Sequence, residues 1–327
     1  MNKARRCHVL IQMLLSYWSK RSNLPYMPIR LWIETTNHCN LRCIMCLNQS
    51  DSMNKRGFMP FPLFKKIIDE SKGFVHRVNL HHRGEPLLHE DLPKMIKYCQ
   101  DNRVFTQIHT NATLLTEDKS YEMIKAGLNF ISFSIDGHDK KSYERVRIGA
   151  RYEDTIENIR QFLKIRKQLK KKTPYTAIEV IDFFQNDWLK VKTMRKEINH
   201  IKPDKLIIKK AHNWAGEYHL DPMEKPSEIN PNSKLLCTFP WYALTIFWDG
   251  TVVTCPQDFF GENKVGDLNK ETLKTLWNNK AQLNYREKIK KKKYDEINSC
   301  RSCDRPRRRH FFSIPTSHLG AFLKEHF

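Results

Sequence analysis

The chain has 327 residues, of which 40 % are hydrophobic and 11 % aromatic, so it can form a folded core and is neither disordered nor collagen-like. Lysine and arginine outnumber aspartate and glutamate by 57 to 36, which gives a formal net charge of +21. This balance favours anionic partners, although a cationic solvated surface is the simpler explanation. No apolar run reaches about 20 residues, so no transmembrane segment is expected.

Residues 1–29 are predicted to form an amphipathic helix and a lead-in to the main domain. The apolar face would contain three pairs, Val9/Leu10, Met13/Leu14 and Tyr17/Trp18, and the polar face His8, Gln12, Ser16 and Lys20. We expect this helix to pack against the main domain. A basic helix on a membrane surface is the alternative.

Residues 30–215 alternate short β-rich runs with helical runs. The predicted strands are Leu31–Thr35, Arg77–His81, Val104–His109, Phe130–Ile135, Thr176–Ile181 and Lys205–Lys209, and the predicted helices are Pro62–Ser71, Asp91–Asp101, Glu117–Ala126, Tyr152–Leu169 and Asp187–Ile201. Such a series predicts an α/β fold with a parallel sheet, a partial (β/α)6 barrel. In barrels of this kind the functional residues follow the strands.

The remainder divides into a polar linker over residues 216–234, a small cysteine-rich domain over 235–310 and a tail over 311–327. The small domain opens with a predicted hairpin, because Asp249-Gly250 separates the β-rich runs Ala243–Trp248 and Thr251–Thr254. The chain has nine cysteines and no secretory signal, which favours a reducing compartment, the cytoplasm, over a disulfide framework.

Cys39, Cys43 and Cys46 form a Cys-x3-Cys-x2-Cys group just after the first predicted strand. Three thiolates from one loop can hold three corners of a cubane iron–sulfur cluster and leave one iron open. A zinc site completed by His38 is the alternative. The motif resembles that of the radical S-adenosylmethionine superfamily. The resemblance implies that S-adenosylmethionine binds a [4Fe-4S] cluster and is cleaved to a 5′-deoxyadenosyl radical that abstracts hydrogen from a substrate.

Further motifs of this family follow the next strands. Arg83-Gly84-Glu85-Pro86 resembles the family's Gly-Gly-Glu-Pro, with Arg83 as a departure, and Thr110-Asn111-Ala112 and Ser134-Ile135-Asp136-Gly137 follow the third and fourth strands. The resemblance implies cofactor contacts for Met45, Gly84, Glu85, Pro86, Asn111, Ser134, Asp136 and Arg147.

Cys237, Cys255, Cys300 and Cys303 form a second group, which on chemistry alone fits either a cluster or zinc. Trp248-Asp249-Gly250, Val265-Gly266-Asp267-Leu268 and Leu276-Trp277-Asn278 lie around it. The region resembles the auxiliary-cluster domains called SPASM, especially their shortened "twitch" form, and its cysteine spacing is similar to that of the butirosin-pathway dehydrogenase type. The resemblance implies one auxiliary [4Fe-4S] cluster.

These observations predict an oxidoreductase, dehydrogenase-like, that acts on a small polar substrate such as an anionic sugar or cyclitol. The auxiliary cluster would accept an electron, and flavodoxin or ferredoxin would supply the reducing electron. Alternatives are a peptide-modifying maturase, an RNA-modifying enzyme favoured only by the charge, and a non-catalytic zinc-binding protein. Nucleic acid is not expected as a partner. His82 and His212, which follow the second and sixth strands, are the candidate acid–base residues.

Overall fold

The computed structural model describes residues 3–50, 53, 55–182, 188–210, 213–216, 235–307, 310–311 and 314–315. The chain divides into two compact units. The first, called the barrel unit, comprises Arg30–Lys210 and Ile246–Gly250. The second unit comprises Met1–Ile29, Ala211–Thr245 and Thr251–Phe327. The five-part division inferred from the sequence stays a prediction.

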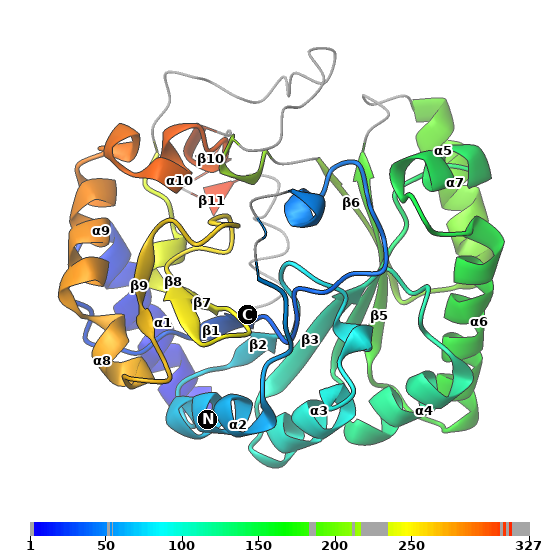
Figure 1. Ribbon diagram of the computed structural model, residues 1–327, viewed down its shortest axis with the longest axis horizontal. Coiled ribbons are helices and arrows are strands. Elements are labelled where there is room, and N and C mark those ends of the chain that lie inside the picture. The colour runs from blue at the N-terminus through cyan, green and yellow to red at the C-terminus, as the bar shows by residue number, and fades with distance from the viewer. Residues whose placement is uncertain are drawn as a thin grey trace. The chain divides into compact units, whose positions relative to one another are not determined.

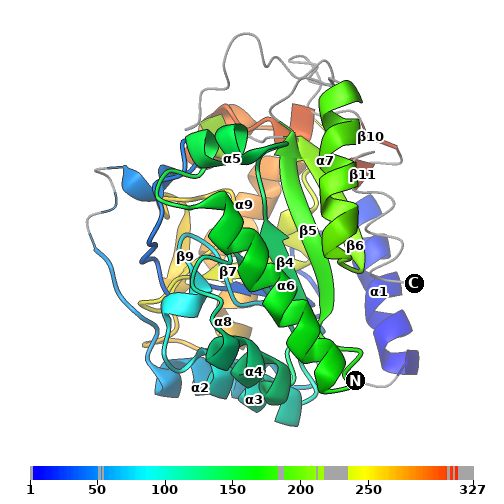
Figure 2. The same ribbon diagram turned by 90° about the vertical axis from the view of Figure 1, so that its right-hand side faces the viewer.

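The barrel unit contains six parallel strands whose order in the sheet follows their order in the chain. The strands are β1 (Arg30–Ile33), β2 (Arg77–Asn79), β3 (Phe105–Thr110), β4 (Phe130–Ser134), β5 (Tyr175–Asp182) and β6 (Lys205–Lys210). The helices are α2 (Phe61–Ser71), α3 (Leu92–Asp101), α4 (Glu117–Ala126), α5 (Lys140–Val146), α6 (Tyr152–Gln168) and α7 (Trp188–Ile201). Helices α2, α3, α4, α6 and α7 lie along one face of the strands, whereas α5 lies toward one end of the strands (Figures 1 and 2).

Alternation along the strands separates a helix-covered face from an inner face. On β4, Phe133 is fully buried and packs edge-to-face against Phe162 of α6, with ring centroids 5.5 Å apart. Its neighbours Ser132 and Ser134 therefore point to the opposite side, because successive side chains alternate across a strand. We call that side the inner face. On β3 the same rule places Gln107 and His109 there.

Local signals explain most helix boundaries of the barrel unit. Thr116 caps α4 by accepting a hydrogen bond from the Lys119 amide, and Gly127 ends that helix in the left-handed conformation (φ 86°). Helix α5 was not predicted. Its start is marked by a capping box in which Asp139 and Ser142 each accept a hydrogen bond from the other's backbone amide.

The second unit holds the N-terminal helix and the region of the second cysteine group. Its helices are α1 (Lys3–Trp18), α8 (Leu273–Trp277), α9 (Lys280–Lys290) and α10 (Asn298–Arg301). Its strands are β8 (Thr251–Val253), β9 (Lys264–Asp267), β10 (His310–Phe311), β11 (Ile314–Pro315) and, except for its last residue, β7 (Ala243–Ile246). Strands β7 and β8 are neighbours in the sheet, and Gly250 turns between them at φ 91°, so the predicted hairpin is confirmed.

The predicted helix α1 is present, but its faces were partly wrong. Leu10, Met13 and Tyr17 are buried as expected. Trp18, which was expected to be buried with them, is 64 % exposed, whereas Ser16, expected on the polar face, is buried. The buried face of the helix is thus rotated slightly from the predicted one, because Leu10, Met13 and Ser16 follow one another at a spacing of three residues. No described helix is long and apolar enough to span a membrane.

Replacement of Phe162 by alanine should destabilise the protein by about 3–5 kcal/mol, because a fully buried aromatic side chain leaves a cavity. The midpoint of urea unfolding measures the effect. Lys164→Ala is the matched control, since Lys164 is exposed on the same helix and its loss should change stability by no more than about 0.5 kcal/mol. Equal effects of the two substitutions would contradict the assignment of Phe162 to the core.

Candidate active site

The first cysteine group lies in the loop between β1 and the short 3-10 helix Leu47–Gln49. Cys39, Cys43 and Cys46 are each partly buried and form no disulfide. The Cys46 amide donates to the Cys43 carbonyl at 3.0 Å, which closes a tight turn between the last two cysteines. The loop therefore presents the three thiols from one short stretch of backbone.

Asn37 and Asn48 hold this loop in place from within. The Asn37 side chain accepts from the Gly57 amide (2.9 Å) and donates to the Lys55 carbonyl (2.7 Å). Asn48 is buried and donates to the Asn37 carbonyl at 2.8 Å. Arg56 donates to the Asn37 carbonyl and to the Asn48 side chain, at 2.9 and 2.8 Å. These bonds satisfy buried polar groups that otherwise destabilise the loop.

The loop after β2 packs directly against the cysteine loop. The Glu85 amide donates to the His38 carbonyl at 2.8 Å. A Cβ atom on Gly84 would lie 2.4 Å from the Thr36 carbonyl oxygen and 2.5 Å from that of His38. Both atoms belong to the backbone, so only glycine fits at position 84. This close backbone contact explains why the motif has glycine at position 84.

The Glu85 carboxylate connects the loops after β2 and β3. It accepts hydrogen bonds from the Thr110 hydroxyl (2.7 Å), the Asn111 amide (2.8 Å) and the Leu87 amide (3.0 Å). Burial raises the pKa of Glu85, and the hydrogen bonds oppose this effect. The Asn111 side chain in turn donates to the Asn40 side chain at 3.0 Å, next to Cys39.

Asp136 and Arg147 join the cysteine loop to the end of β4. Arg147 donates to the Asp136 carboxylate (3.0 Å), which also accepts from the Ile181 amide (2.7 Å). Burial raises the pKa of Asp136, and Arg147 opposes this effect. The second guanidinium nitrogen lies 3.9 Å from the Cys43 sulfur. The structure thus brings Glu85, Asn111, Asp136 and Arg147 together around the three thiols.

The other predicted site residues have different surroundings. Met45 is buried, Pro86 starts a 3-10 helix, and Ser134 ends β4 beside Glu179 in the strand register. The His82 side chain is only 3 % exposed and stacks on Phe247 with centroids 5.6 Å apart. His212 lies outside the described residues. The cofactor and acid–base roles assigned from the sequence stay predictions.

Glu34 explains the departure at Arg83, and sequence reasoning missed it. Arg83 donates two hydrogen bonds, of 2.5 and 2.7 Å, to the fully buried Glu34 carboxylate, and its guanidinium lies 3.6 Å from the Phe247 ring centroid. Burial raises the pKa of Glu34, but hydrogen bonds from Arg83 and His82 outweigh it and lower the value to about 2. The only sequence signal for this pair was that an acidic residue, Glu34, directly follows the first strand and a basic residue, Arg83, follows the second.

The first three thiols fit a metal cluster by their chemistry. Burial raises the pKa of Cys39 to about 12 and that of Cys46 to about 11. Burial also raises the pKa of Cys43, although the positive charge of Arg147 opposes the effect. Neighbouring thiols raise the Cys39 value further. A group of buried thiols is therefore poorly suited to ionise alone, whereas iron would supply the positive charge that stabilises thiolates.

The second cysteine group gathers from four parts of the second unit. Cys237 precedes a 3-10 helix, Cys255 follows β8, Cys300 lies in α10, and Cys303 follows it. Burial raises the pKa of all four thiols, and for Cys255 the other three add to the effect. Four buried thiols in one unit are a donor set that again fits a cluster. No described group of His, Cys, Asp or Glu side chains forms a site for a single metal ion.

Hydrogen bonds fix the segments that carry these cysteines. The Asp258 carboxylate accepts from the Glu262 and Asn263 amides at 2.9 and 2.8 Å, which shapes the loop after Cys255. Asn263 then donates to the Ser299 hydroxyl beside Cys300 at 2.6 Å. Asn213 donates to the Ser302 carbonyl at 2.7 Å and accepts from the Asp304 amide.

The inner face of the barrel unit carries a connected set of polar side chains, which we call the inner-face network. His81 and His109 stack with ring centroids 4.2 Å apart. Glu179 lies 3.8 Å from the His109 ring nitrogen and 2.8 Å from the Lys209 ammonium. His109, Glu179 and Lys209 remain 22, 15 and 41 % exposed, so solvent reaches the network.

Burial and hydrogen bonding in the network favour the neutral form of both imidazoles, His81 and His109. The His109 amide donates to Nδ1 of His81, so the His81 proton resides on Nε2. Burial lowers the pKa of His81 and of His109 well below the ordinary value. Beneath the network, the Asn79 Nδ2 and Ser132 Oγ atoms are buried and lack a hydrogen-bond partner among the described residues. Buried polar atoms of this kind often await a ligand or water.

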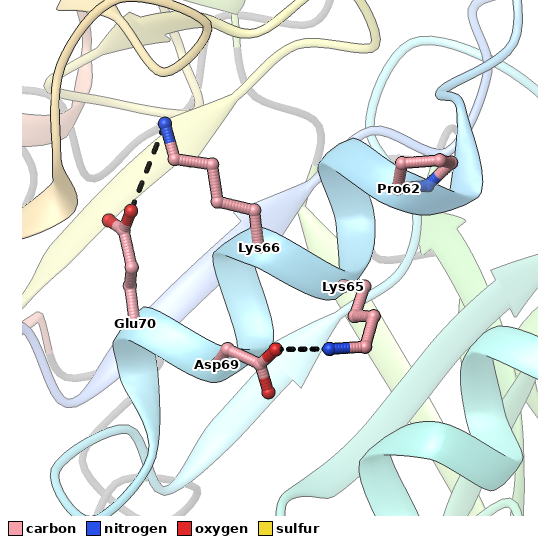
Figure 3. A pocket seen from close by; sticks show the side chains of 5 residues that line it. All are labelled: Pro62, Lys65, Lys66, Asp69 and Glu70. Carbon is pink, nitrogen blue, oxygen red and sulfur yellow. Dashed lines mark hydrogen bonds and ion pairs between the residues drawn. The ribbon is translucent and has the colours of Figure 1, made fainter.

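A pocket on the surface of α2 is lined by neither cysteines nor members of the inner-face network. It is lined by Pro62, Lys65, Lys66, Asp69 and Glu70 (Figure 3). Lys65 pairs with Asp69 at 2.7 Å and Lys66 with Glu70 at 3.8 Å, both at the i,i+4 spacing of one helix face. These opposite charges compensate one another, so the pocket reads as a solvated helix surface.

Residues 33–176 match the model of the radical SAM superfamily, and residues 237–304 match the SPASM iron–sulfur cluster-binding domain. The protein belongs to the radical SAM superfamily. Its cofactors are accordingly S-adenosylmethionine and iron–sulfur clusters, a [4Fe-4S] cluster of the radical SAM domain and auxiliary clusters of the SPASM domain. The predicted partial barrel with a small C-terminal cluster domain is confirmed.

Similar proteins cover most of this radical SAM chain. A tungsten-containing aldehyde ferredoxin oxidoreductase cofactor-modifying protein of Pyrococcus furiosus is 22 % identical, with 83 % of this chain and 86 % of that protein covered. BtrN, in a structure with AdoMet and 2-DOIA, superposes with a TM-score of 0.57 at 17 % identity, over 89 % of this chain and 96 % of BtrN. Streptococcus suis SuiB bound to its precursor peptide SuiA gives a TM-score of 0.62 at 16 % identity, over 90 and 74 %. Several other relatives match over only 27 to 45 % of their length.

Gly84→Ala should remove iron from the first cluster site, because the new Cβ collides with two backbone carbonyls beside the cysteine loop. Iron and sulfide content of anaerobically purified protein measures the loss. We expect a decrease by about half, with the auxiliary cluster as an internal control within the same chain. Full iron content in this variant would contradict the proposed constraint at Gly84.

Arg83→Met should destabilise the protein by about 3–5 kcal/mol, because it removes the guanidinium that compensates the buried charge of Glu34. Thermal or urea unfolding measures the change. The double variant Glu34→Gln/Arg83→Met should recover much of the loss, since no uncompensated charge remains. A double variant as unstable as the single one would show that shape, and not charge, determines this site.

Proposed function

We propose that this radical SAM enzyme oxidises a small polar substrate, an alcohol of the sugar or cyclitol class bearing an anionic group. The inner-face network of His81, His109, Glu179 and Lys209 carries the proposal, because it offers hydrogen-bond donors, a carboxylate and an exposed cation in a solvent-accessible place. The resemblance of the fold to BtrN supports the same class.

The net reaction removes two hydrogens from a carbinol carbon and its hydroxyl. When bound, the first cluster with S-adenosylmethionine supplies a radical that takes the carbon-bound hydrogen atom, and the auxiliary cluster supplies an acceptor for one electron. The hydroxyl proton goes to a base of the protein, and the carbon–oxygen single bond becomes a ketone. One hydrogen atom, one proton and one electron thus account for the two-electron oxidation.

The inner-face network offers a role for each charged group. We take Lys209 as the residue that holds an anionic substituent, because its ammonium is 41 % exposed yet oriented by Glu179. We take Glu179 as a third candidate proton acceptor, in addition to the sequence candidates His82 and His212, because it is the carboxylate of the network. His81, with its proton on Nε2, can donate a hydrogen bond to a substrate hydroxyl.

The cysteine ligands and the partners follow from the same proposal. We propose Cys39, Cys43 and Cys46 as ligands of the first cluster and Cys237, Cys255, Cys300 and Cys303 as ligands of the auxiliary cluster. Reduced thiols require a reducing compartment, so the cytoplasm remains the expected location. A small one-electron donor protein, flavodoxin or ferredoxin, remains the expected reductant.

The test is an anaerobic turnover of reduced protein with S-adenosylmethionine and a panel of phosphorylated or carboxylated sugars and cyclitols. We expect a ketone product and one 5′-deoxyadenosine per product, both quantified by mass spectrometry. A product in which the substrate carbon is joined to another group would contradict an oxidation.

Two variants test the inner-face network with that substrate. Lys209→Met should raise KM about ten-fold or more, because a charged hydrogen bond is lost, with Lys164→Met as the surface control. Glu179→Gln should lower product formation about 100-fold while 5′-deoxyadenosine still forms, because hydrogen abstraction precedes proton transfer. Unchanged kinetics in both variants would contradict the assignment of the inner-face network to the substrate site.

A peptide substrate is the second candidate, favoured by the likeness to SuiB bound to its precursor peptide. An enzyme of that kind would leave all the small molecules of the panel unchanged. It would instead consume S-adenosylmethionine in the presence of a peptide and change the mass of that peptide. Such a result would replace the small-molecule proposal.

A further inference from the structure

Tyr285 contacts a ligand of the auxiliary cluster through its hydroxyl. The residue lies on α9 and is only 7 % exposed. Its hydroxyl oxygen is 3.1 Å from the Cys300 sulfur, which is hydrogen-bond distance for an acceptor sulfur. The Tyr285 hydroxyl is thus a neutral donor to the Cys300 sulfur in a buried setting.

A hydrogen bond to a ligand thiolate changes the electronic properties of a cluster. Reduction adds one negative charge, which spreads onto the sulfur ligands. A donor at one of these sulfurs stabilises the added charge and therefore raises the reduction potential. The effect is strong where the surroundings are dry, because water does not screen it. Tyr285 and Cys300 are both buried, so this condition is met.

We propose that Tyr285 is a positioning residue that raises the reduction potential of the cluster held by Cys237, Cys255, Cys300 and Cys303. A higher potential makes this cluster a better electron acceptor. That consequence rests on the proposed oxidation, whereas the effect on the potential does not depend on any substrate.

Tyr294 provides a matched control within the same unit. It is fully buried and also lies next to a cysteine of this group. Its hydroxyl accepts from the Cys237 amide at 3.1 Å and donates to the Leu235 carbonyl, so it bonds the backbone and not a sulfur. Loss of the Tyr294 hydroxyl should disturb local packing to a similar degree without removing a donor to a ligand.

The experiment is a redox titration of the auxiliary cluster, followed by electron paramagnetic resonance. The parent protein carries Cys39, Cys43 and Cys46 replaced by alanine, so that only the auxiliary cluster remains. Dithionite and mediators supply one electron per cluster, and no bond forms or breaks. Tyr285→Phe and Tyr294→Phe are each made in this parent, and iron is counted in every sample.

We expect full iron content and a more negative midpoint potential in Tyr285→Phe, and a smaller shift in Tyr294→Phe. The proposal is overturned if Tyr285→Phe titrates at the parent potential. It is equally overturned if Tyr294→Phe shifts as far as Tyr285→Phe, or if Tyr285→Phe loses its iron, since Tyr285 would then be a packing residue. No substrate is used, so failure of the proposed oxidation leaves these outcomes readable.

Discussion

The contact between the loops after β1 and β2 is the constraint on which the first cluster site depends. The Glu85 amide reaches the His38 carbonyl, and Gly84 lies so close to the backbone of Thr36 that no side chain fits. This close approach fixes the cysteine loop against the sheet. It also aims the Glu85 carboxylate at the loop after β3, so a single backbone contact determines the placement of several side chains.

Burial with too little compensation distinguishes the cysteines from the other polar groups of the site. Glu34 has Arg83, Asp136 has Arg147, and Glu85 has three hydrogen-bond donors. For the thiols, burial raises the pKa of each, and Arg147, at 3.9 Å from the Cys43 sulfur, does not offset it. A buried group that must ionise needs a partner, and for thiolates that partner is iron. Both cysteine groups follow this rule, although the fold around them differs.

Much of the fold followed from local patterns. Period-two strands, helix caps such as Thr116 and the Asp249-Gly250 turn act over a few residues, so the order of strands and the hairpin could be predicted. Helix α5 was missed because its seven residues carry too little periodicity, although its capping box was legible. Trp18 was placed on the wrong face because helical periodicity alone does not say which edge of an apolar stripe a neighbour covers.

The sequence by itself determined the family, through two cysteine groups of distinctive spacing and short motifs placed after successive strands. Only the tertiary structure decided that Arg83 pairs with Glu34, that His109 stacks on His81 and that Tyr285 reaches Cys300. These pairs are separated along the chain by elements of varying length, so no local period records them. They depend on strand register and helix packing, which are fixed when the whole chain folds.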